Sequence, residues 1–265
     1  MKTAVLAIAA LALAGCGSTM DLKNRPGYGQ GSGERMGGVP LRPIANPSEV
    51  AATDIAFARA ARDDGQWTAF RRYAADGAVI HGRNGPIDAD PWLAAQDDPK
   101  VPVQWTPTAV WSSCDGSTAV TQGKFADPEG NWGYYVTVWE RQRDGRYRWV
   151  YDMGAPDDQL TAAENARREN TPTGENAIVI RAIEAIEGRV ADCRPAGSSG
   201  KPPMLIPPDG TDVRRGYSED STLGWTSMHM ANGRRVLQVS KWRNGDFEQV
   251  LWFGVDPDGK HVPDQ

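Results

Sequence analysis

The sequence predicts an α+β protein in which helices come first, an antiparallel meander follows, and a second helix-plus-antiparallel-meander unit completes the chain. Apolar residues recur at helical spacing between residues 46 and 95. Strand-like segments joined by turn residues follow this region, up to about residue 153. A similar order of helix and strands returns after residue 157. These patterns are typical of helices packed against an antiparallel sheet.

The first folded unit is predicted to begin with two helices. Asn46-Pro47-Ser48-Glu49 offers a capping residue, a proline at the first helical position and an acid in the first turn. A helix therefore begins there, and residues 63–65 end it. Aromatic residues at three-residue spacing predict a second helix over 66–74. The next predicted elements are a strand at 78–81, a turn-rich loop at 82–88 and a short helix at 90–95.

Four strand-like segments then predict an antiparallel meander, because each is joined to the next by good turn residues. The turns are Cys114-Asp115-Gly116, Asp127-Pro128-Glu129-Gly130 and Asp144-Gly145. The strands are predicted at about 103–112, 117–125, 132–142 and 146–153.

The second unit, residues 158–265, is predicted to hold helices followed by another meander. A polar helix is expected over about 157–170, and a clearer one opens at 173–175 and ends at Gly188. Strands are predicted at about 213–217, 222–231, 234–243 and 246–254. The segment 145–154 aligns without gaps to 245–254. The alignment suggests that the second unit is a degenerate copy of the first or an extra sheet packed on it. The alternative is that the two segments are similar only because such hairpin patterns are common.

The first fifteen residues have the pattern of a secretory signal. Met1-Lys2 is a short positive start, and the apolar run 4–13, about ten residues long, is too short to span a bilayer. Leu13-Ala14-Gly15-Cys16 resembles the bacterial lipoprotein box, which implies that Cys16 is acylated and anchors the chain in a membrane. Gly17 rather than Asp follows it, as in cargo sent to the outer membrane.

These features predict a lipid-anchored protein of the cell envelope that faces the periplasm. Residues 16–45 are expected to form a flexible tether, because 27–33 alternate glycine with other residues. In that oxidising compartment Cys114 and Cys193 could form a disulfide between the two halves of the chain. Two buried free thiols are the alternative.

Composition and motifs exclude several function classes. The formal net charge of -5 argues against a nucleic-acid binder, which needs a basic face. No metal site is expected, since His81, His229 and His261 are far apart and show no ligand spacing. No nucleophile elbow, Walker loop or dinucleotide fingerprint occurs, so no cofactor is expected.

A pattern extends over residues 56–58, 67–74, 76–79, 92–93, 133–139 and 152–154. Through this pattern, residues 46–156 resemble the SnoaL-like branch of the nuclear-transport-factor-2-like superfamily. The resemblance implies a cone-shaped domain over 46–157, in which a curved sheet wraps around helices and leaves a mostly apolar pocket. That superfamily contains enzymes, ligand carriers and interaction modules, so the fold does not fix the function. Members of that superfamily often form dimers through the open face of the sheet. The resemblance therefore implies either a dimer of this chain or coverage of that face by the second unit of the same chain.

His81 and Asp152 are the candidate catalytic residues. The resemblance implies that acid–base residues lie near the end of the strand that carries His81. Strict alternation along the last strand places Asp152 on the face of Arg148 and Val150, away from Trp149. A His–Asp pair across the cone would form a general base. A hydrogen-bonded scaffold histidine and a turn-capping aspartate are the alternative.

Aromatic residues of the first unit are candidates for ligand binding. Alternation places Tyr135, Thr137 and Trp139 on one strand face, where an aromatic lining could hold a hydrophobic ligand. Core packing is the alternative, and tryptophans in both units favour it. The candidate ligand-binding residues are Tyr73, Trp92, Trp105, Tyr135 and Trp139.

Three functions remain open from the sequence. The first is a lipid-anchored module that binds a small hydrophobic ligand or an envelope protein. The second is a cofactor-free isomerase or dehydratase that uses His81 and Asp152. The third is a structural envelope protein. The enzyme requires both groups at one cavity, whereas the binding module requires only an apolar cavity or an apolar patch.

Overall fold

The computed structural model describes residues 44–171, 185–195, 197–198, 200–203, 207 and 210–263. The signal segment, Cys16 and the tether up to residue 43 lie outside this range, as does most of the helix predicted over 173–187. Among the described helices, none is long and apolar enough to cross a membrane.

Two helices open the described chain, and their bounds agree with the prediction. Helix α1 follows Asn46 and carries proline at its start, and Gly65 separates it from α2. The helices are α1 (Pro47–Asp64), α2 (Gln66–Tyr73), α3 (Ala89–Ala94) and α4 (Asp158–Glu169).

The first sheet has seven strands in the order β2-β1-β6-β5-β4-β3-β7. The predicted meander forms its centre, within three residues of the expected bounds. The loop predicted at 82–88 instead contains a short strand, β2, that pairs with β1. The strands are β1 (Ala74–Gly82), β2 (Gly85–Asp88), β3 (Gln104–Ser112), β4 (Thr118–Ala126), β5 (Trp132–Arg141), β6 (Tyr147–Pro156) and β7 (Glu187–Val190).

Strand β7 corrects one sequence prediction. A helix was expected to end at Gly188, but Glu187–Val190 pairs in parallel with β3 at the edge of the first sheet. Strands β1 and β6 are also parallel. The sheet is therefore mixed, although its central meander is antiparallel.

The second sheet is an antiparallel meander in the order β12-β11-β10-β9-β8. Its main strands lie within two residues of the predicted positions. They are β8 (Asp212–Tyr217), β9 (Leu223–His229), β10 (Arg235–Arg243), β11 (Asp246–Val255) and β12 (His261–Val262).

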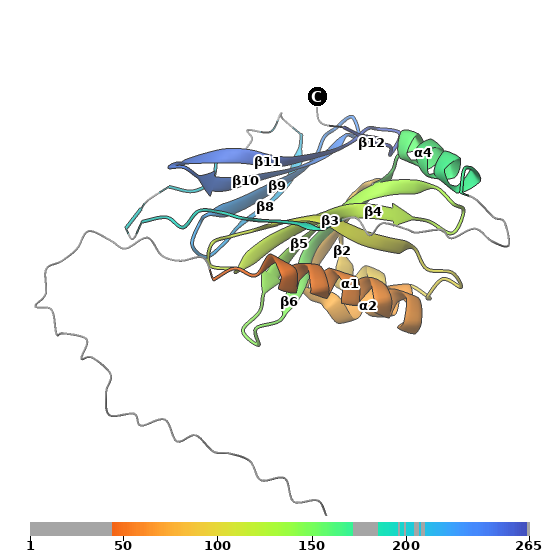
Figure 1. Cartoon of the computed structure of the whole chain (residues 1–265), viewed down its shortest axis with the longest axis horizontal. Helices are drawn as coiled ribbons and strands as arrows, with labels where there is room; N and C mark the ends of the chain where they lie inside the picture. The colour runs from red at the N-terminus through yellow and green to blue at the C-terminus, as the bar shows by residue number, and fades with distance from the viewer. Residues whose placement is uncertain are drawn as a thin grey trace, which may run out of the picture. The chain divides into compact units, whose positions relative to one another are not determined.

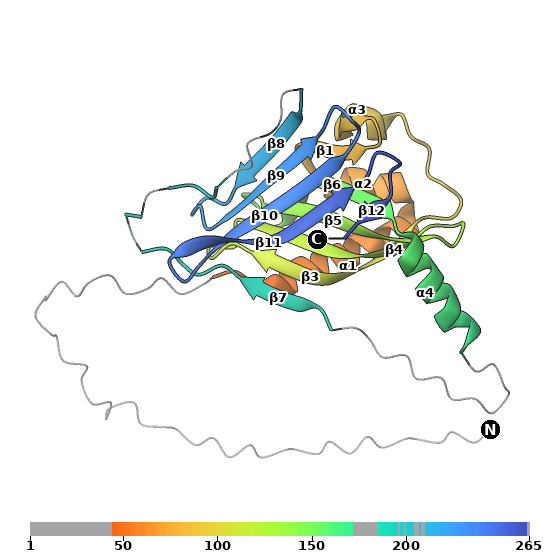
Figure 2. The ribbon, with the colours of Figure 1, turned by 90° about the horizontal axis from the view of Figure 1, so that it is seen from above.

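The elements from residue 44 onward stack in three layers, with helices α1 and α2 on one face of the first sheet and the second sheet on the other (Figures 1 and 2). Each interface has its own core. Phe57, Leu93 and Trp149 belong to the core on the helix side. Val136 and Tyr151 of the first sheet pack with Phe253 and other residues of the second. The predicted α+β class, with a curved sheet around helices, is confirmed.

Bulges bend the two meanders at matching positions. The β5–β6 pairing shifts register between Val138 and Trp139, which leaves Val150 as the extra residue. The β10–β11 pairing shifts between Val239 and Ser240, which leaves Val250 as the extra residue. Val150 and Val250 are equivalent in the ungapped alignment. Such bulges bend the strand that carries them and increase its local twist.

A disulfide and reciprocal hydrogen bonds meet at the β3–β4 turn, and the hydrogen bonds join the two sheets there. Cys114, in the β3–β4 turn, is bonded to Cys193, which follows β7. The backbone NH of Asp115 donates to Asp220 Oδ2 at 2.9 Å, and the NH of Asp220 donates to Asp115 Oδ2 at 3.0 Å. The NH of Cys114 donates to Thr222 Oγ1. These hydrogen bonds hold the β3–β4 turn against the turn between β8 and β9.

Candidate functional site

His81 and Asp152 lie on neighbouring strands but on opposite faces of the first sheet. In the parallel β1–β6 pair, Asp152 lies opposite Ile80, so the next residue, His81, points the other way. Asp152 accepts a hydrogen bond from Thr137 Oγ1 on the helix side. His81 contacts Tyr151 between the two sheets. The predicted acid–base pair is therefore wrong, because the pleat separates its members.

The bulge in β6 also changes the expected face of Asp152. The pairing register leaves Val150 as an extra residue, so Trp149 faces the helices while Tyr151 faces the second sheet. Asp152 consequently shares the helix side with Trp149, contrary to strict alternation. Alternation alone could not reveal the bulge.

His81 is part of a buried polar cluster between the sheets. Its Nδ1 lies 2.6 Å from Tyr151 Oη and 3.2 Å from Ser227 Oγ, and its Nε2 lies 3.3 Å from His229 Nδ1. Burial, followed by the positive charge of Arg235, lowers the pKa of His81 to about 3. A neutral imidazole at physiological pH fits a structural role in this cluster.

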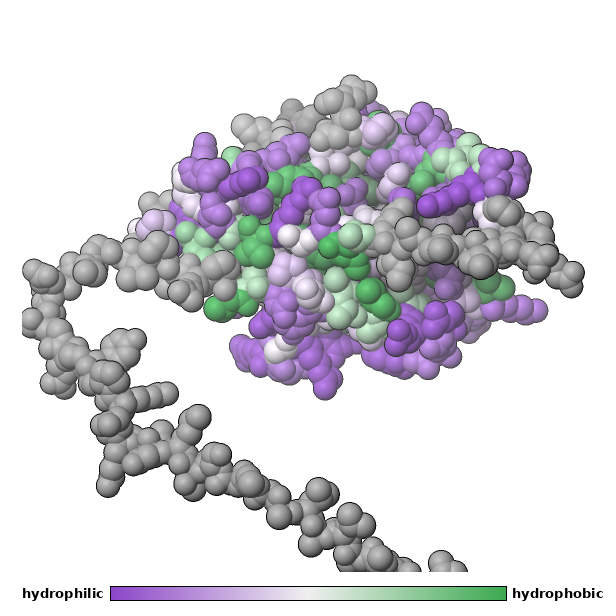
Figure 3. All heavy atoms as spheres, viewed as in Figure 1, coloured by the Kyte–Doolittle hydropathy of each residue, from purple (hydrophilic) through white to green (hydrophobic). Residues whose placement is uncertain are grey.

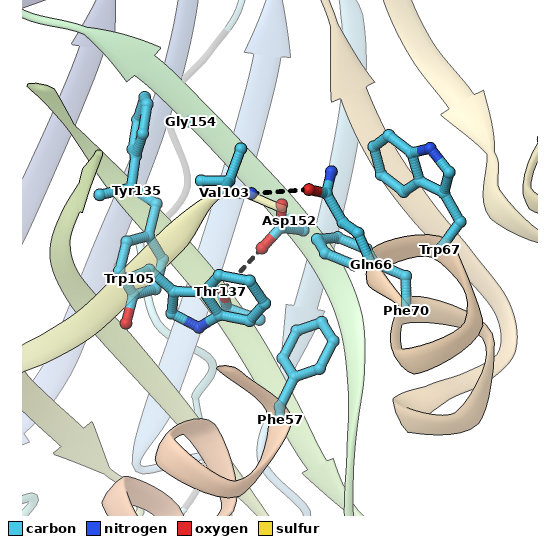
Figure 4. Close-up of a pocket in the computed structure, with 11 residues that line it drawn as sticks. Phe57, Gln66, Trp67, Phe70, Val103, Trp105, Tyr135, Thr137, Asp152 and Gly154 are labelled. Carbon is cyan, nitrogen blue, oxygen red and sulfur yellow. Dashed lines mark hydrogen bonds between the residues drawn. The ribbon is translucent and has the colours of Figure 1, made fainter. Parts of the chain in front are cut away.

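A cavity of about 320 Å³ lies between α1, α2 and the first sheet (Figure 4). Its size is that of a site for a small molecule. Aromatic side chains dominate the lining, and Asp152 is the carboxyl group among them. The lining residues are Phe57, Gln66, Trp67, Phe70, Val103, Trp105, Phe125, Tyr135, Thr137, Asp152 and Gly154.

Of the five aromatic residues predicted to bind a ligand, two line the cavity and three lie outside its lining. Trp105 and Tyr135 are in its wall. Tyr73 and Trp92 lie behind it, with ring centroids 5.0 Å from Phe57 and Trp67 respectively. Trp139 is fully buried and donates from Nε1 to Thr121 Oγ1. These three support the wall rather than face the cavity.

Asp152 is the titratable group best placed for chemistry or recognition. Thr137 Oγ1 donates to its Oδ2 at 2.7 Å (Figure 4). Burial raises the pKa of Asp152 to about 7, the Thr137 hydrogen bond lowers it, and the charge of Asp54 raises it further. The carboxyl group therefore changes charge near neutral pH.

Asp54, which the sequence reading missed, fixes two aromatic walls of the cavity. Its fully buried carboxyl group accepts hydrogen bonds at 2.9 Å from Trp105 Nε1 and from Tyr135 Oη. Burial raises its pKa. The signal was present in the sequence, because Asp54 follows Val50 by four residues and precedes Phe57 by three. An acid at that position in an apolar helical stripe needs buried partners.

Helix α2 brings three lining residues to the cavity, and Asp98 holds its first turn. The Asp98 carboxylate accepts hydrogen bonds from the backbone NH groups of Trp67 and Thr68 and from the Thr68 hydroxyl. These bonds, the hydroxyl first, lower the pKa of Asp98. Gly65 has a φ of 110°, and a Cβ there would lie 2.3 Å from Asp98 Oδ2. Glycine is therefore required for the sharp turn between α1 and α2.

Within the described residues, no group of three or more His, Cys, Asp or Glu side chains could hold a metal ion. The lining that the structure describes for this cavity contains a single carboxyl group and no imidazole or thiol. The arrangement suits recognition of a molecule, or proton exchange with it, through one carboxyl group in an aromatic cavity.

Comparison with known proteins gives only distant likeness. Neither a protein-family model nor a curated protein matches the chain. A solved structure from Xanthomonas campestris, described as a calcium/calmodulin-dependent protein kinase II association domain, is 16% identical with a TM-score of 0.33, covering 48% of this chain and 99% of that one. A structure from Kribbella flavida DSM 17836 is 21% identical with a TM-score of 0.27, covering 45% and 97%. At these TM-scores neither structure informs the activity of this chain.

Proposed function

We propose that the protein binds a small, largely apolar molecule in the cavity beneath α1 and α2, with one polar group of that molecule on Asp152. The observation that carries this proposal is the lining itself, in which six aromatic residues surround one carboxyl group. A cavity with an apolar wall and few convergent polar groups is the usual form of a small-molecule site. Asp54 supports the proposal further, because its two hydrogen bonds hold Trp105 and Tyr135 in place.

The docking of an envelope protein has less support on the described surface. The large hydrophobic side chains exposed there are Ile44, Ile55 and Val101, which belong to different segments. On the face in Figure 3, hydrophilic residues interrupt the hydrophobic ones. A docking face is usually a contiguous apolar patch. The enzyme with a His81–Asp152 pair also loses support, since the two side chains do not share a cavity.

The binding proposal predicts one saturable site for 2-naphthol, a small apolar probe with a single hydroxyl donor, in isothermal titration calorimetry at pH 7.5. Gly154→Leu should lower the affinity at least tenfold, because Gly154 lines the cavity and the larger side chain would occupy part of it. Val101→Leu, at an exposed position outside the cavity, is the matched control. Unchanged binding of 2-naphthol in Gly154→Leu would contradict the proposal, and so would a wild type that binds no small aromatic probe.

We also propose that acylated Cys16 anchors this binding domain to the envelope, periplasm-facing and in the outer membrane. The sequence Leu13-Ala14-Gly15-Cys16 supports this, and so does the Cys114–Cys193 disulfide, which is typical of oxidising compartments. In a bacterial host, the full chain should enter the detergent phase on Triton X-114 partition, whereas Cys16→Ser should enter the aqueous phase. Aqueous partition of both chains would exclude the anchor.

A further inference from the structure

The cavity offers electron-rich groups without a cationic side chain in its lining. Six aromatic residues contribute π systems, and Asp152 contributes the ionisable carboxyl group. No Lys, Arg or His is among the lining residues. Aromatic faces and a carboxylate both attract cations, whereas an anionic ligand would find no counter-charge in this lining.

The Asp152 carboxyl group retains capacity for a further partner. Thr137 donates to Oδ2 at 2.7 Å, and among the described residues no donor reaches Oδ1. Oδ1 is also absent from the buried polar atoms that lack a partner, which agrees with a position open to the cavity. A carboxylate can accept several hydrogen bonds, so Oδ1 is free to accept from a ligand.

The charged and titratable groups around Asp152 reinforce the need for a cation. From α1, Asp54 adds negative charge, which raises the pKa of Asp152. From β5 and β6, Tyr135 and Tyr151 are phenols whose pKa values burial raises, so they are neutral when Asp152 ionises. Among the described residues, no positively charged group is a cause of the pKa shift of Asp152. A bound cation would therefore supply a counter-charge that the described lining around Asp152 does not provide.

We infer that the cavity selects small organic cations, such as aryl- or alkylammonium groups, over neutral and anionic molecules of similar size. This inference rests on the proposed binding function and adds the class of ligand. In the bound state the ammonium group would lie against Asp152 Oδ1, and its organic substituent would pack among Trp67, Phe70 and Trp105. Cation–π contacts and the ion pair both strengthen when water is displaced from such a site.

Benzyltrimethylammonium, benzyl alcohol and benzoate form a matched set of probes, because they share an aromatic ring and differ in charge. At pH 8 we expect the cation to bind the wild type at least tenfold more tightly than the alcohol, and benzoate to bind most weakly. Benzyltrimethylammonium keeps its charge at every pH. Its affinity should therefore fall as pH decreases from 8 to 5.5, because Asp152, whose pKa is about 7, becomes protonated.

Asp152→Asn is the isosteric control, since it keeps the shape and an acceptor for Thr137 but removes the charge. In this variant the cation should lose its advantage over benzyl alcohol, and its affinity should no longer depend on pH. Gly154→Leu should weaken all probes that bind, which locates them in the cavity.

The possible outcomes separate the inference from the proposal beneath it. If benzyl alcohol binds as tightly as the cation, or if Asp152→Asn binds the cation as well as the wild type does, selection of cations is overturned while the cavity remains a binding site. If neither the three probes nor 2-naphthol binds, the proposed function fails as well.

Discussion

Replacing Asp152 with Asn should raise the free energy of unfolding by about 4 kcal/mol at pH 8. The native pKa of Asp152 is about 7, against an ordinary value of 3.8 for an aspartate side chain, and burial is the largest cause of the difference. Above pH 7 the folded protein holds an ionised carboxyl group that would be better solvated in the unfolded chain. Asparagine removes that cost, and its carbonyl oxygen can still accept from Thr137 Oγ1.

The gain in stability from Asp152→Asn should be larger at high pH than at low pH. Between pH 3.8 and 7 the folded wild type binds the proton more strongly than the unfolded chain, so the stability of the wild type decreases as pH rises through this window. The advantage of Asp152→Asn should therefore shrink to about 1.5 kcal/mol at pH 5.

Urea denaturation at both pH values, followed by circular dichroism, measures this difference. Glu129→Gln, on an exposed turn, controls for the loss of one negative charge. If Asp152→Asn were less stable than the wild type at pH 8, the carboxyl group would not carry a burial cost. A gain in stability on removal of a polar group would mark Asp152 as a residue retained for function.

The sequence was most informative where local chemistry determines structure. Asn46-Pro47 begins α1 and Gly65 ends it, and the Asp144-Gly145 turn joins β5 to β6. Periodicity also assigned Tyr135 and Thr137 correctly to one face of β5, because that strand is regular where they lie. These signals act within a few residues of one another, so they can be read without knowing the tertiary structure.

The candidate site depended on longer-range features that the sequence did not reveal. A bulge at Val150 moved Asp152 to the face of β6 that carries Trp149. The parallel pairing of β6 with β1 placed His81 on the opposite face of the sheet from Asp152. Strand β7 pairs with β3, although its residues were expected to end a helix. Register and pairing partners are set by tertiary packing, which can override local preference.

The two meanders differ in what covers their outer faces. Both have a bulge at equivalent valines, and both place apolar residues in their shared interface. Helices α1 and α2 cover the outer face of the first sheet and border the cavity, whereas no described helix covers the outer face of the second (Figure 1). In the ungapped alignment the position of Asp152 is taken by Trp252. The carboxyl group therefore occurs only in the meander whose outer face is enclosed.

Loss of the Cys114–Cys193 disulfide should lower the free energy of unfolding by about 4 kcal/mol. The two cysteines are 79 residues apart, so the bond restricts a long segment of the unfolded chain. It also ties the end of β7, the last strand of the first sheet, to the β3–β4 turn. That turn contacts the second sheet through Asp115 and Asp220.

The test compares Cys114→Ala, Cys193→Ala and the double variant in urea, with and without dithiothreitol. Either substitution removes the whole bond, so each single variant should lose nearly as much stability as the double variant, and the losses should not add. Reductant should lower the free energy of unfolding of the wild type to that of the double variant. It should leave the free energy of unfolding of the double variant unchanged. Equal stability of oxidised and reduced wild type would show that the reciprocal Asp115–Asp220 contacts hold the junction without the disulfide. A large loss would show instead that the stability of the folded chain depends on the covalent bond, and therefore on an oxidising environment.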